Sequence, residues 1–495
     1  MKKINILLNI DKTFIPKAKY VFRTFFSIIG FKPIFYNTFG PANVDIYYGI
    51  PSVHRYPVKI AYNKSSADFF KQKNVIESKF LNFVKYKGIN IPFLFSGQGE
   101  IFSFYEKHCL IQKDIVASAF YFLSCWQEYV YDKVYPDEYK KEDFLQIEHD
   151  FNNIPVVDFY ADILKTALKN TETGHPGKNL WGRYDYVVSV SHNLTYWNFW
   201  TDELYQKYKK NFFRHFKKHP LRAVRNIWIY RNKHNAVNYR EKKIKSLIEY
   251  SSHYGVKPSV FILSGHNNSD KRMNYFEDEE IRQKISSLSG DLKFNFYGSP
   301  DSAVDISVAE SEYKKLASFA KNPNGYRSFR LSSRYQKTYD LLEKTGIKYS
   351  SLSGFREVTG FRAGVSFPFY PYNHEENRHF NFLEIPVSVM DLPLFSGNFL
   401  DLNARNGFEF LKEMSKNAKI LNGHLSLLWN MRMFDSVNLE KWQQIYWKFL
   451  KFTQKDNGRV LSSDQLYTFW TRRKETQEIF GAKDNARQMI SSGEK

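Results

Sequence analysis

The 495-residue sequence has little cysteine, few glycines and no long apolar run. Two cysteines, Cys109 and Cys125, cannot build a disulfide framework, and we expect both to be buried structural thiols in a reducing cytoplasm. No run of about 18 uncharged apolar residues occurs, so we expect no transmembrane helix. The 24 glycines and 17 prolines are too few for a collagen-like or low-complexity chain.

The amino terminus is basic and then apolar, as a signal peptide would be. Its apolar part, Ile4–Ile10, is short, and no small-residue cleavage site follows it. We therefore interpret Ile4–Ile10 as a first β-strand. The sequence predicts a cytoplasmic protein without a signal peptide, and it leaves open peripheral contact with the inner membrane.

Positive charge and aromatic residues are abundant. Lys and Arg number 72 against 51 Asp and Glu, giving a formal charge of +21, and aromatic residues make up 18% of the chain. So much apolar bulk excludes a disordered chain. The charge favours an anionic partner, which could be nucleic acid, an anionic lipid surface or an acidic glycan.

Hydrophobic patterns divide the chain into two folded parts. Residues 1–170 are expected to form an α/β domain, residues 171–182 a linker, residues 183–475 a second domain and residues 476–495 a polar tail. In the second domain strands alternate with helices, which predicts a parallel sheet or an α/β barrel. The strands expected there are Tyr184–Ser191, Ser259–Leu263, Asp291–Tyr297, Ile347–Ser350, Phe382–Val389, Lys419–Trp429 and Arg459–Leu461.

Several segments, in order, resemble a known bacterial family. In the first half they are Asp45-Ile-Tyr-Tyr-Gly49, Asp114-Ile-Val-Ala-Ser-Ala-Phe120, Trp126-Gln-Glu-Tyr129 and Ile154-Pro-Val-Val-Asp158; in the second they are Leu341-Leu-Glu-Lys-Thr-Gly-Ile-Lys-Tyr349, Gly360-Phe-Arg-Ala-Gly364, Leu383-Glu-Ile-Pro386, Met390-Asp391 and Ser426-Leu-Leu-Trp429. The second half resembles the polysaccharide deacetylases of carbohydrate esterase family four, and the first half resembles the uncharacterised domain that precedes them in one subgroup. The resemblance implies an α/β fold, an N-terminal α/β domain followed by a distorted (β/α) barrel.

The resemblance also implies a metal-dependent hydrolase, but the catalytic positions are changed. In the family a divalent ion, typically zinc, is held by one Asp and two His, and it activates a water for attack on an acetyl group. Here the first motif is Ser191-His192-Asn193-Leu194-Thr195, with Asn193 and Thr195 in place of two carboxylates. Tyr297 and Asn430 stand where the family has His.

With these substitutions the family's chemistry is lost. We expect a catalytically silent pseudoenzyme with no metal or other cofactor, serving as a binding or scaffold component in bacterial surface-polysaccharide or envelope assembly. An active metal-dependent carbohydrate N- or O-deacetylase with relocated ligands, acting on C–N bonds if on amides, is the alternative. The residues expected to line a carbohydrate pocket at the barrel mouth are His192, Trp197, Tyr297, Arg327, Arg362, Trp429 and Asn430.

Other histidines could replace the lost metal ligands only if the fold places them close together. His374 and His379 lie five residues apart with two Glu between them, which is not a zincin spacing, and we expect a solvated loop there. His424 is expected to be a hydrogen-bonded core or rim residue. Ser191 and His192 are adjacent on one strand and should point to opposite faces, so they cannot form a nucleophile–base pair.

A basic segment interrupts the barrel pattern at about 201–245. Residues 201–250 hold 14 Lys and Arg against 4 Asp and Glu, and residues 207–231 predict two helices with aromatic or apolar stripes. An interfacial helix pair on anionic lipid is one interpretation. A platform for an acidic glycan or protein and an ordinary helix pair with a solvated basic side are the others. No nucleic-acid-binding motif accompanies the charge, so no nucleic-acid partner is expected.

Overall fold

The structure is a computed structural model, and several stretches of the chain lie outside its described residues. It describes residues 1–37, 41, 43–77, 80–134, 144–174, 179–197, 202–218, 220–231, 236–267, 270–329, 335–396, 400–435 and 439–480. Part of the expected linker, 175–178, and most of the expected tail, 481–495, are therefore not described. Among the described residues, no helix is both long and apolar enough to cross a membrane.

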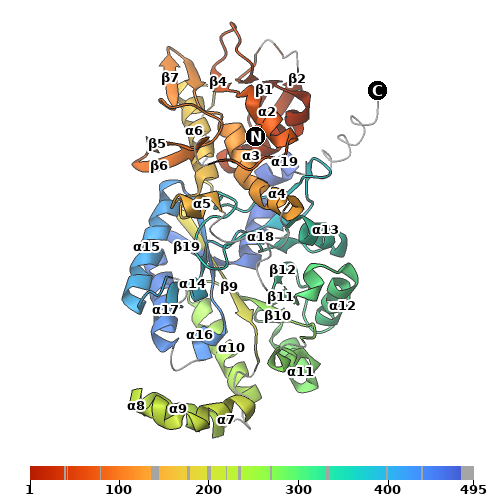
Figure 1. Cartoon of the computed structure of the whole chain (residues 1–495), viewed down its shortest axis with the longest axis vertical. Coiled ribbons are helices and arrows are strands. Elements are labelled where there is room, and N and C mark those ends of the chain that lie inside the picture. The colour runs from red at the N-terminus through yellow and green to blue at the C-terminus, as the bar shows by residue number, and fades with distance from the viewer. Residues whose placement is uncertain are drawn as a thin grey trace.

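The N-terminal half is built on a six-stranded sheet (Figure 1). The strand order is β2-β1-β3-β4-β8-β7, parallel except for the β7–β8 pair. A separate antiparallel hairpin is made by β5 and β6. The strands are β1 Lys3–Asn9, β2 Lys32–Asn37, β3 Ile46–Gly49, β4 Val58–Ala61, β5 Asn82–Tyr86, β6 Ile89–Phe93, β7 Phe102–Tyr105 and β8 His108–Ile111. The helices are α1 Ile15–Ile29, α2 Lys64–Lys71, α3 Ile115–Leu123, α4 Trp126–Val134, α5 Leu145–Glu148 and α6 Val156–Asn170.

The second half contains a nine-stranded, curled parallel sheet, which confirms the expected α/β barrel architecture. Its order is β16-β13-β12-β11-β10-β9-β18-β17. Strand β19 pairs with the same edge of β9 as β10 does, but with the first part of β9, whereas β10 pairs with its end. The strands are β9 Tyr186–Leu194, β10 Ser259–Leu263, β11 Lys293–Gly298, β12 Gly325–Ser328, β13 Tyr349–Ser350, β16 Leu383–Glu384, β17 Val389–Met390, β18 His424–Leu428 and β19 Gly458–Ser462. A small hairpin, β14 Tyr372–Asn373 and β15 Arg378–His379, lies outside the barrel sheet.

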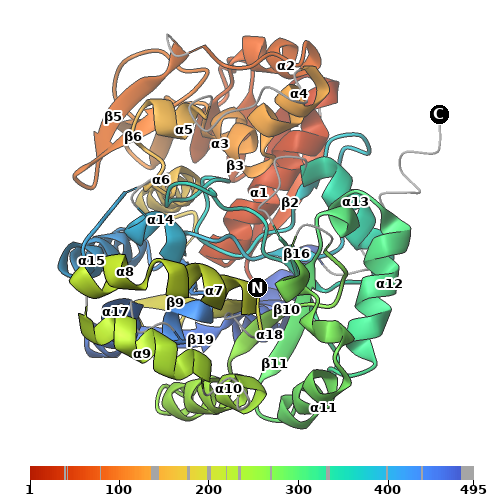
Figure 2. The same cartoon turned by 60° about the horizontal axis from the view of Figure 1, so that its bottom comes forward.

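Helices follow most of the barrel strands, as crossover connections between parallel strands require. They are α7 Asp202–Lys210, α8 Phe212–Lys218, α9 Pro220–Arg231, α10 Ala236–Ser252, α11 Glu279–Leu288, α12 Ile306–Ala317, α13 Tyr335–Thr345, α14 Asp391–Phe395, α15 Ala404–Ile420, α16 Arg432–Asp435, α17 Glu440–Lys455, α18 Ser463–Arg472 and α19 Lys474–Phe480. Figure 2 shows these helices on the outside, with the strands between them.

The expected single strand at Phe382–Val389 is two short strands. Pro386 lacks a backbone N–H and cannot continue the ladder. Around it the chain crosses the seam of the barrel: the N–H of Ile385 bonds to β13, and the N–H of Ser388 donates to the carbonyl of Ser426 on β18. Residues 385–388 thereby connect the β16 side of the sheet to the β18 side.

The two halves share one hydrophobic core. The long segment between β13 and β14 lies against the N-terminal half, where the N–H of Phe361 donates to the carbonyl of Asn152 and the N–H of Val157 donates to the carbonyl of Gly364. Gly360, with φ +130°, approaches so closely that an added Cβ would lie 2.2 Å from the Asn152 carbonyl oxygen. A side chain at this position would therefore push the halves apart.

The C-terminal tail begins later than residue 476. Helix α19 extends to Phe480 and packs on α1 and β2 of the N-terminal half. Thr476 and Ile479 are buried there. The sequence pattern suggested a polar tail because only one apolar pair, Ile479 and Phe480, marks this short helix.

Candidate functional site

A buried arginine occupies the interior of the barrel. Arg327 is on β12 and is 0% exposed. Its Nη1 donates to Asn193 Oδ1 at 2.8 Å, and its Nη2 donates to the hydroxyls of Ser191 and Ser351, each at 2.9 Å. The guanidinium also lies 4.2 Å above the centroid of the Phe261 ring. Desolvation by burial lowers the pKa of Arg327 to about 10, so the group remains charged at neutral pH.

Three of the family's catalytic positions meet around this guanidinium. Asn193 is on β9 and accepts a hydrogen bond from Arg327, and Tyr297 on β11 pairs in register with Arg327 on β12. The Tyr297 hydroxyl lies close enough to Asn193 and Thr195 for side-chain hydrogen bonding to lower its pKa, but burial dominates and raises that pKa to about 12. The structure therefore brings Asn193, Thr195, Tyr297 and Arg327 together inside the barrel.

The fourth position, Asn430, has a separate partner. It follows β18, and its backbone N–H and side-chain Nδ2 donate to the two carboxylate oxygens of Asp391 at 2.7 and 2.6 Å. Asp391 is fully buried, and desolvation raises its pKa to about 6. A carboxylate therefore does remain at these strand ends, where it is bound by an amide.

Two of the expected pocket residues point away from the barrel interior. Side chains alternate along β9, so His192 faces the opposite side from Ser191 and Asn193. Its Nδ1 contacts the carbonyl of Trp429 at 2.9 Å, and its Nε2 lies 3.4 Å from the Tyr446 hydroxyl. Trp429 itself is 0% exposed and packs on Tyr446 of α17. The prediction that His192 and Trp429 line a pocket is therefore wrong.

Trp197 and Arg362 also fail to line the mouth. Trp197 is 1% exposed, and its carbonyl accepts a hydrogen bond from Arg240 Nε at 2.9 Å. Arg362 lies between the two halves of the protein, where its Nε bonds to Glu128 Oε1 at 3.0 Å. Both predictions are wrong, because Trp197 is buried inside the protein and Arg362 forms an ion pair with the N-terminal half.

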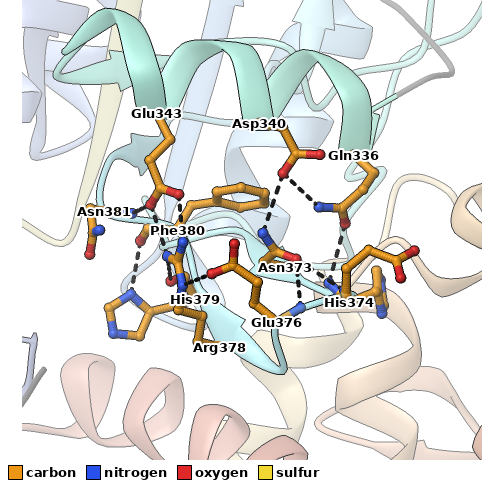
Figure 3. Close-up of polar contacts among 11 residues, drawn as sticks. Gln336, Asp340, Glu343, Asn373, His374, Glu376, Arg378, His379, Phe380 and Asn381 are labelled. Carbon is orange, nitrogen blue, oxygen red and sulfur yellow. Dashed lines mark hydrogen bonds and ion pairs between the residues drawn. The ribbon is translucent and has the colours of Figure 1, made fainter. Parts of the chain in front are cut away.

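The His374 and His379 segment is a hairpin whose turn, residues 375–377, is exposed as expected, whereas His374 is partly buried and His379 is buried (Figure 3). His374 Nε2 contacts the carbonyl of Ser124 at 2.7 Å, whereas His379 Nδ1 contacts the carbonyl of Phe380. Desolvation lowers the pKa of His374 to about 3 and that of His379 to about 4. Arg378 binds Glu343 of α13 through two nitrogens, so the hairpin and α13 are held together by charge. The two imidazoles serve separate backbone contacts.

The residues present do not fit the metal that the family resemblance implies. Asn193, Thr195 and Tyr297 offer neutral oxygens, whereas zinc takes thiolate, imidazole or carboxylate ligands and hard divalent ions need carboxylates among their oxygen ligands. The Arg327 guanidinium already places a positive charge among them. Within the described ranges, no three His, Cys, Asp or Glu side chains gather as a metal site would require. His424 is a core histidine bonded to Ser366 and Ser189, as predicted.

A basic hollow lies elsewhere on the barrel, between the starts of β10 and β11 and helix α18. Its cations are Lys257, Lys293, Arg459, Arg472 and Arg473, and the ring of Phe469 forms part of its wall. Asp464, which also lines it, already binds Ser259 and Asn295. The hollow combines several cations with an aromatic ring, and no sequence pattern indicates it because its residues come from three separate segments.

Comparison with known proteins gives one family match and several distant structural similarities. Residues 6–173 match the family model described as a family of unknown function, DUF7033, which confirms an uncharacterised N-terminal domain. Similar solved structures include a probable polysaccharide deacetylase from Pseudomonas aeruginosa PAO1, 13% identical, and Puue allantoinase, 11% identical. For each, the TM-score is 0.39 and the alignment covers 61% of this chain and 96% of the other. These structural similarities are too weak to identify the fold, so the barrel is identified from its strand order alone. No curated protein sequence matches the chain.

The sequence did not reveal the partners that complete the site. Ser191 and Ser351 bind Arg327, and Asp391 binds Asn430. Ser191 could have been found, because it lies two residues before Asn193 on one strand and so faces the same side. Ser351 and Asp391 follow very short strands, and no sequence pattern indicates which way they face.

Proposed function

We propose that the protein is a catalytically silent, deacetylase-like barrel that acts as a binding or scaffold component in bacterial surface-polysaccharide or envelope assembly. The observation that carries this proposal is the Arg327 guanidinium, bonded to Asn193 among the family's catalytic positions. A resident cation supplied by the chain takes the hydrogen-bond acceptors that a hydrolase would present to a metal. The envelope setting comes from the family resemblance.

Electrostatics supports the loss of metal chemistry. Two positive charges a few ångströms apart repel by several kcal/mol at the effective dielectric of a protein surface, and by more in the interior. Asn193 has no charge to offset that repulsion, and its amide cannot accept a proton as a general base does. Tyr297, with its pKa raised to about 12, is a neutral phenol at physiological pH.

The basic hollow supports a binding role. Lys257, Lys293 and Arg459 present donors for carboxylate or phosphate groups, and Phe469 offers a ring face for a sugar. An acidic polysaccharide therefore suits the hollow better than a neutral one. This replaces the sugar-stacking role expected of Trp197 and Trp429, which are inside the protein.

The catalytic half of the proposal is tested by rebuilding the lost donors. The triple variant Asn193→Asp, Thr195→Asp, Tyr297→His is compared with the quadruple variant that also carries Arg327→Met, and zinc binding is measured by calorimetry with folding checked by circular dichroism. We expect wild type to hold no stoichiometric zinc, and the quadruple variant to bind zinc at least tenfold more tightly than the triple. One zinc per wild-type chain, with chelator-sensitive acetate release from an acetylated oligosaccharide, would contradict the proposal.

A further inference from the structure

Helices α7, α8 and α9 form a row at the end of the molecule opposite the N-terminal half (Figures 1 and 2). They follow β9 in the chain, so they emerge at the carboxyl ends of the barrel strands. In Figure 1 the row lies across the long axis of the molecule. Its outer side is therefore an end face of the protein.

This row carries one sign of charge. Residues 204–240 hold 11 Lys and Arg and no Asp or Glu. Lys209 and Lys210 at the end of α7, and Arg214 and Lys217 on α8, are exposed. An acid-free stretch of this length produces a positive potential to which anionic surfaces are attracted.

Helix α9 turns its large apolar side chains outward. Leu221, Val224 and Trp228 share one face and are 86%, 55% and 65% exposed. Among its described side chains the buried ones are Ala223, which is 0% exposed, and Asn226, which donates to the Tyr208 hydroxyl of α7. A surface helix normally has the opposite arrangement, with its apolar stripe toward the core.

Helix α8 extends the same property. Phe213 is 79% exposed and Phe216 is 41% exposed, and α8 packs beside α9. Five large apolar side chains and four cations thus lie on two neighbouring helices and the end of a third. We call this set the end face, and its members are Lys209, Lys210, Phe213, Arg214, Phe216, Lys217, Leu221, Val224 and Trp228. Clustered exposed apolar groups of this kind mark an interaction surface.

We propose that the end face docks on a lipid bilayer that contains anionic headgroups. Amphipathic helices that lie in a membrane interface combine Lys and Arg with Trp, Phe and Leu, as the end face does. The cations bind the headgroups while the apolar side chains enter the acyl boundary. A protein partner would need acidic side chains next to an apolar groove, whereas an anionic bilayer offers negative headgroups above an apolar interior over its whole surface. The proposal is independent of the silent barrel, since it uses none of the same residues.

Vesicle flotation with charge-matched variants tests the electrostatic part. The full chain is mixed with phosphatidylcholine vesicles, with or without phosphatidylglycerol. The end-face variant K209E/K210E/R214E/K217E is compared with K3E/K12E/K64E/K85E, which makes the same change of charge at exposed lysines of the N-terminal half. Each basic residue near an anionic surface contributes on the order of fivefold to binding. We expect wild type to float only with anionic vesicles, the end-face variant to bind at least tenfold more weakly, and the N-terminal control variant to bind like wild type. Equal losses in both variants, or no flotation of wild type, would overturn the proposal.

A site-specific probe tests the apolar part. Both native cysteines are buried, so a cysteine introduced on the surface can be labelled selectively with a polarity-sensitive dye. Val224→Cys probes the end face, and Val53→Cys, at a site that is 95% exposed in the N-terminal half, is its control. Anionic vesicles should shift the emission of the dye at position 224 to the blue and leave that at position 53 unchanged. An equal response at both positions would overturn the proposal, as would a shift at position 224 caused by protein concentration alone, which would indicate contact between two copies.

Discussion

Arg327 and Arg362 are both buried, but their charges are met in different ways. Arg362 is 5% exposed and forms an ion pair with Glu128, which is 6% exposed, across the contact between the two halves of the protein. Arg327 is 0% exposed, and its hydrogen-bond partners among the described residues are two serines and an asparagine. Arg362 is neutralised by a direct ion pair, whereas Arg327 forms no ion pair among the described residues and the charge of Glu384 acts on its pKa only through space.

The difference shows that burial alone does not explain what a charged residue does. A buried ion pair is a structural element, because removing either member leaves the other charge unpaired. An arginine with neutral partners is stabilised mainly by hydrogen bonds and by the ring of Phe261, so its charge stays available to repel another cation. Glu384 is the acidic counterpart: it is 0% exposed and accepts hydrogen bonds from four neutral groups.

The largest effect is expected from breaking the paired arginine. Arg362→Met should lower the free energy of unfolding by about 3–5 kcal/mol, because it leaves the Glu128 carboxylate buried without its cation. Urea unfolding measures this change. The double variant Arg362→Met, Glu128→Met removes both charges and should recover most of the loss. If the single variant loses less than about 1 kcal/mol, the ion pair does not hold the two halves together.

The contribution of Glu384, a buried acid that forms no ion pair among the described residues, to the free energy of unfolding should depend on pH. Desolvation raises the pKa of Glu384 to about 7, above its value of about 4.3 in an unfolded chain. The folded state therefore keeps this proton over a range in which the unfolded state has lost it. Its contribution to stability is fully present below about pH 4 and is lost as pH rises through 7, a change of about 3 kcal/mol since one pKa unit is about 1.4 kcal/mol.

Glu384→Gln should remove this part of the pH dependence. Glutamine can accept from the N–H groups of Leu352 and Ser353 through its oxygen, and it can donate from its nitrogen to the hydroxyls of Ser350 and Tyr339. The measurement is the free energy of unfolding of both proteins at pH 5 and at pH 8. We expect the variant to gain relative to wild type at pH 8. Parallel stability curves for the two proteins would show that Glu384 does not titrate in this range.

Removing the unpaired arginine should cost less than removing the paired one. Arg327→Met leaves the acceptors of Ser191, Asn193 and Ser351 without donors, and an unsatisfied buried polar group costs about 1–3 kcal/mol. No direct ion pair of the described residues is broken, and the desolvation of the guanidinium is relieved, so we expect a net loss of about 2–3 kcal/mol in chemical unfolding. A loss equal to that of Arg362→Met would mean that Arg327 has an anionic partner after all.

The alternation of strand and helix patterns along the sequence predicted the elements of the barrel better than those of the N-terminal half. The strands expected at Ser259–Leu263 and Asp291–Tyr297 match β10 and β11 closely, because each is a short apolar run bounded by turn residues. Helix α1 carries a weaker signal, because its second half contains Val21, Phe22, Phe25 and Phe26, residues typical of strands, and that half is buried almost all round.

The sequence indicated which residue types lie near the site, but it did not indicate in which direction their side chains point. Periodicity placed Asn193 and Tyr297 at strand ends, and it correctly put Ser191 and His192 on opposite faces. It could not show that Trp429 turns outward against α17 or that Arg362 reaches the N-terminal half, because both depend on contacts between distant segments. It also could not show that Arg327 enters the barrel, since arginine is usually a surface residue.

The smallest expected change in the free energy of unfolding is also the most direct test of the charge of Arg327. Asn193→Asp is nearly isosteric and places a carboxylate 2.8 Å from the Arg327 guanidinium, where Asn193 Oδ1 now lies. The guanidinium is already desolvated in the wild type, so the new ion pair should raise the free energy of unfolding at pH 7 by about 1–2 kcal/mol, within the range for hydrogen bonds to charged groups. The new carboxylate should have a lowered pKa beside the cation, so the gain is present at pH 7 and is lost as pH falls through that lowered pKa. Arg327→Met, Asn193→Asp is the control, and it should be less stable than Arg327→Met alone because the carboxylate then lacks its cation. A destabilised Asn193→Asp protein at pH 7 would show that the charge of Arg327 is already balanced, and the comparison between the two arginines would fail.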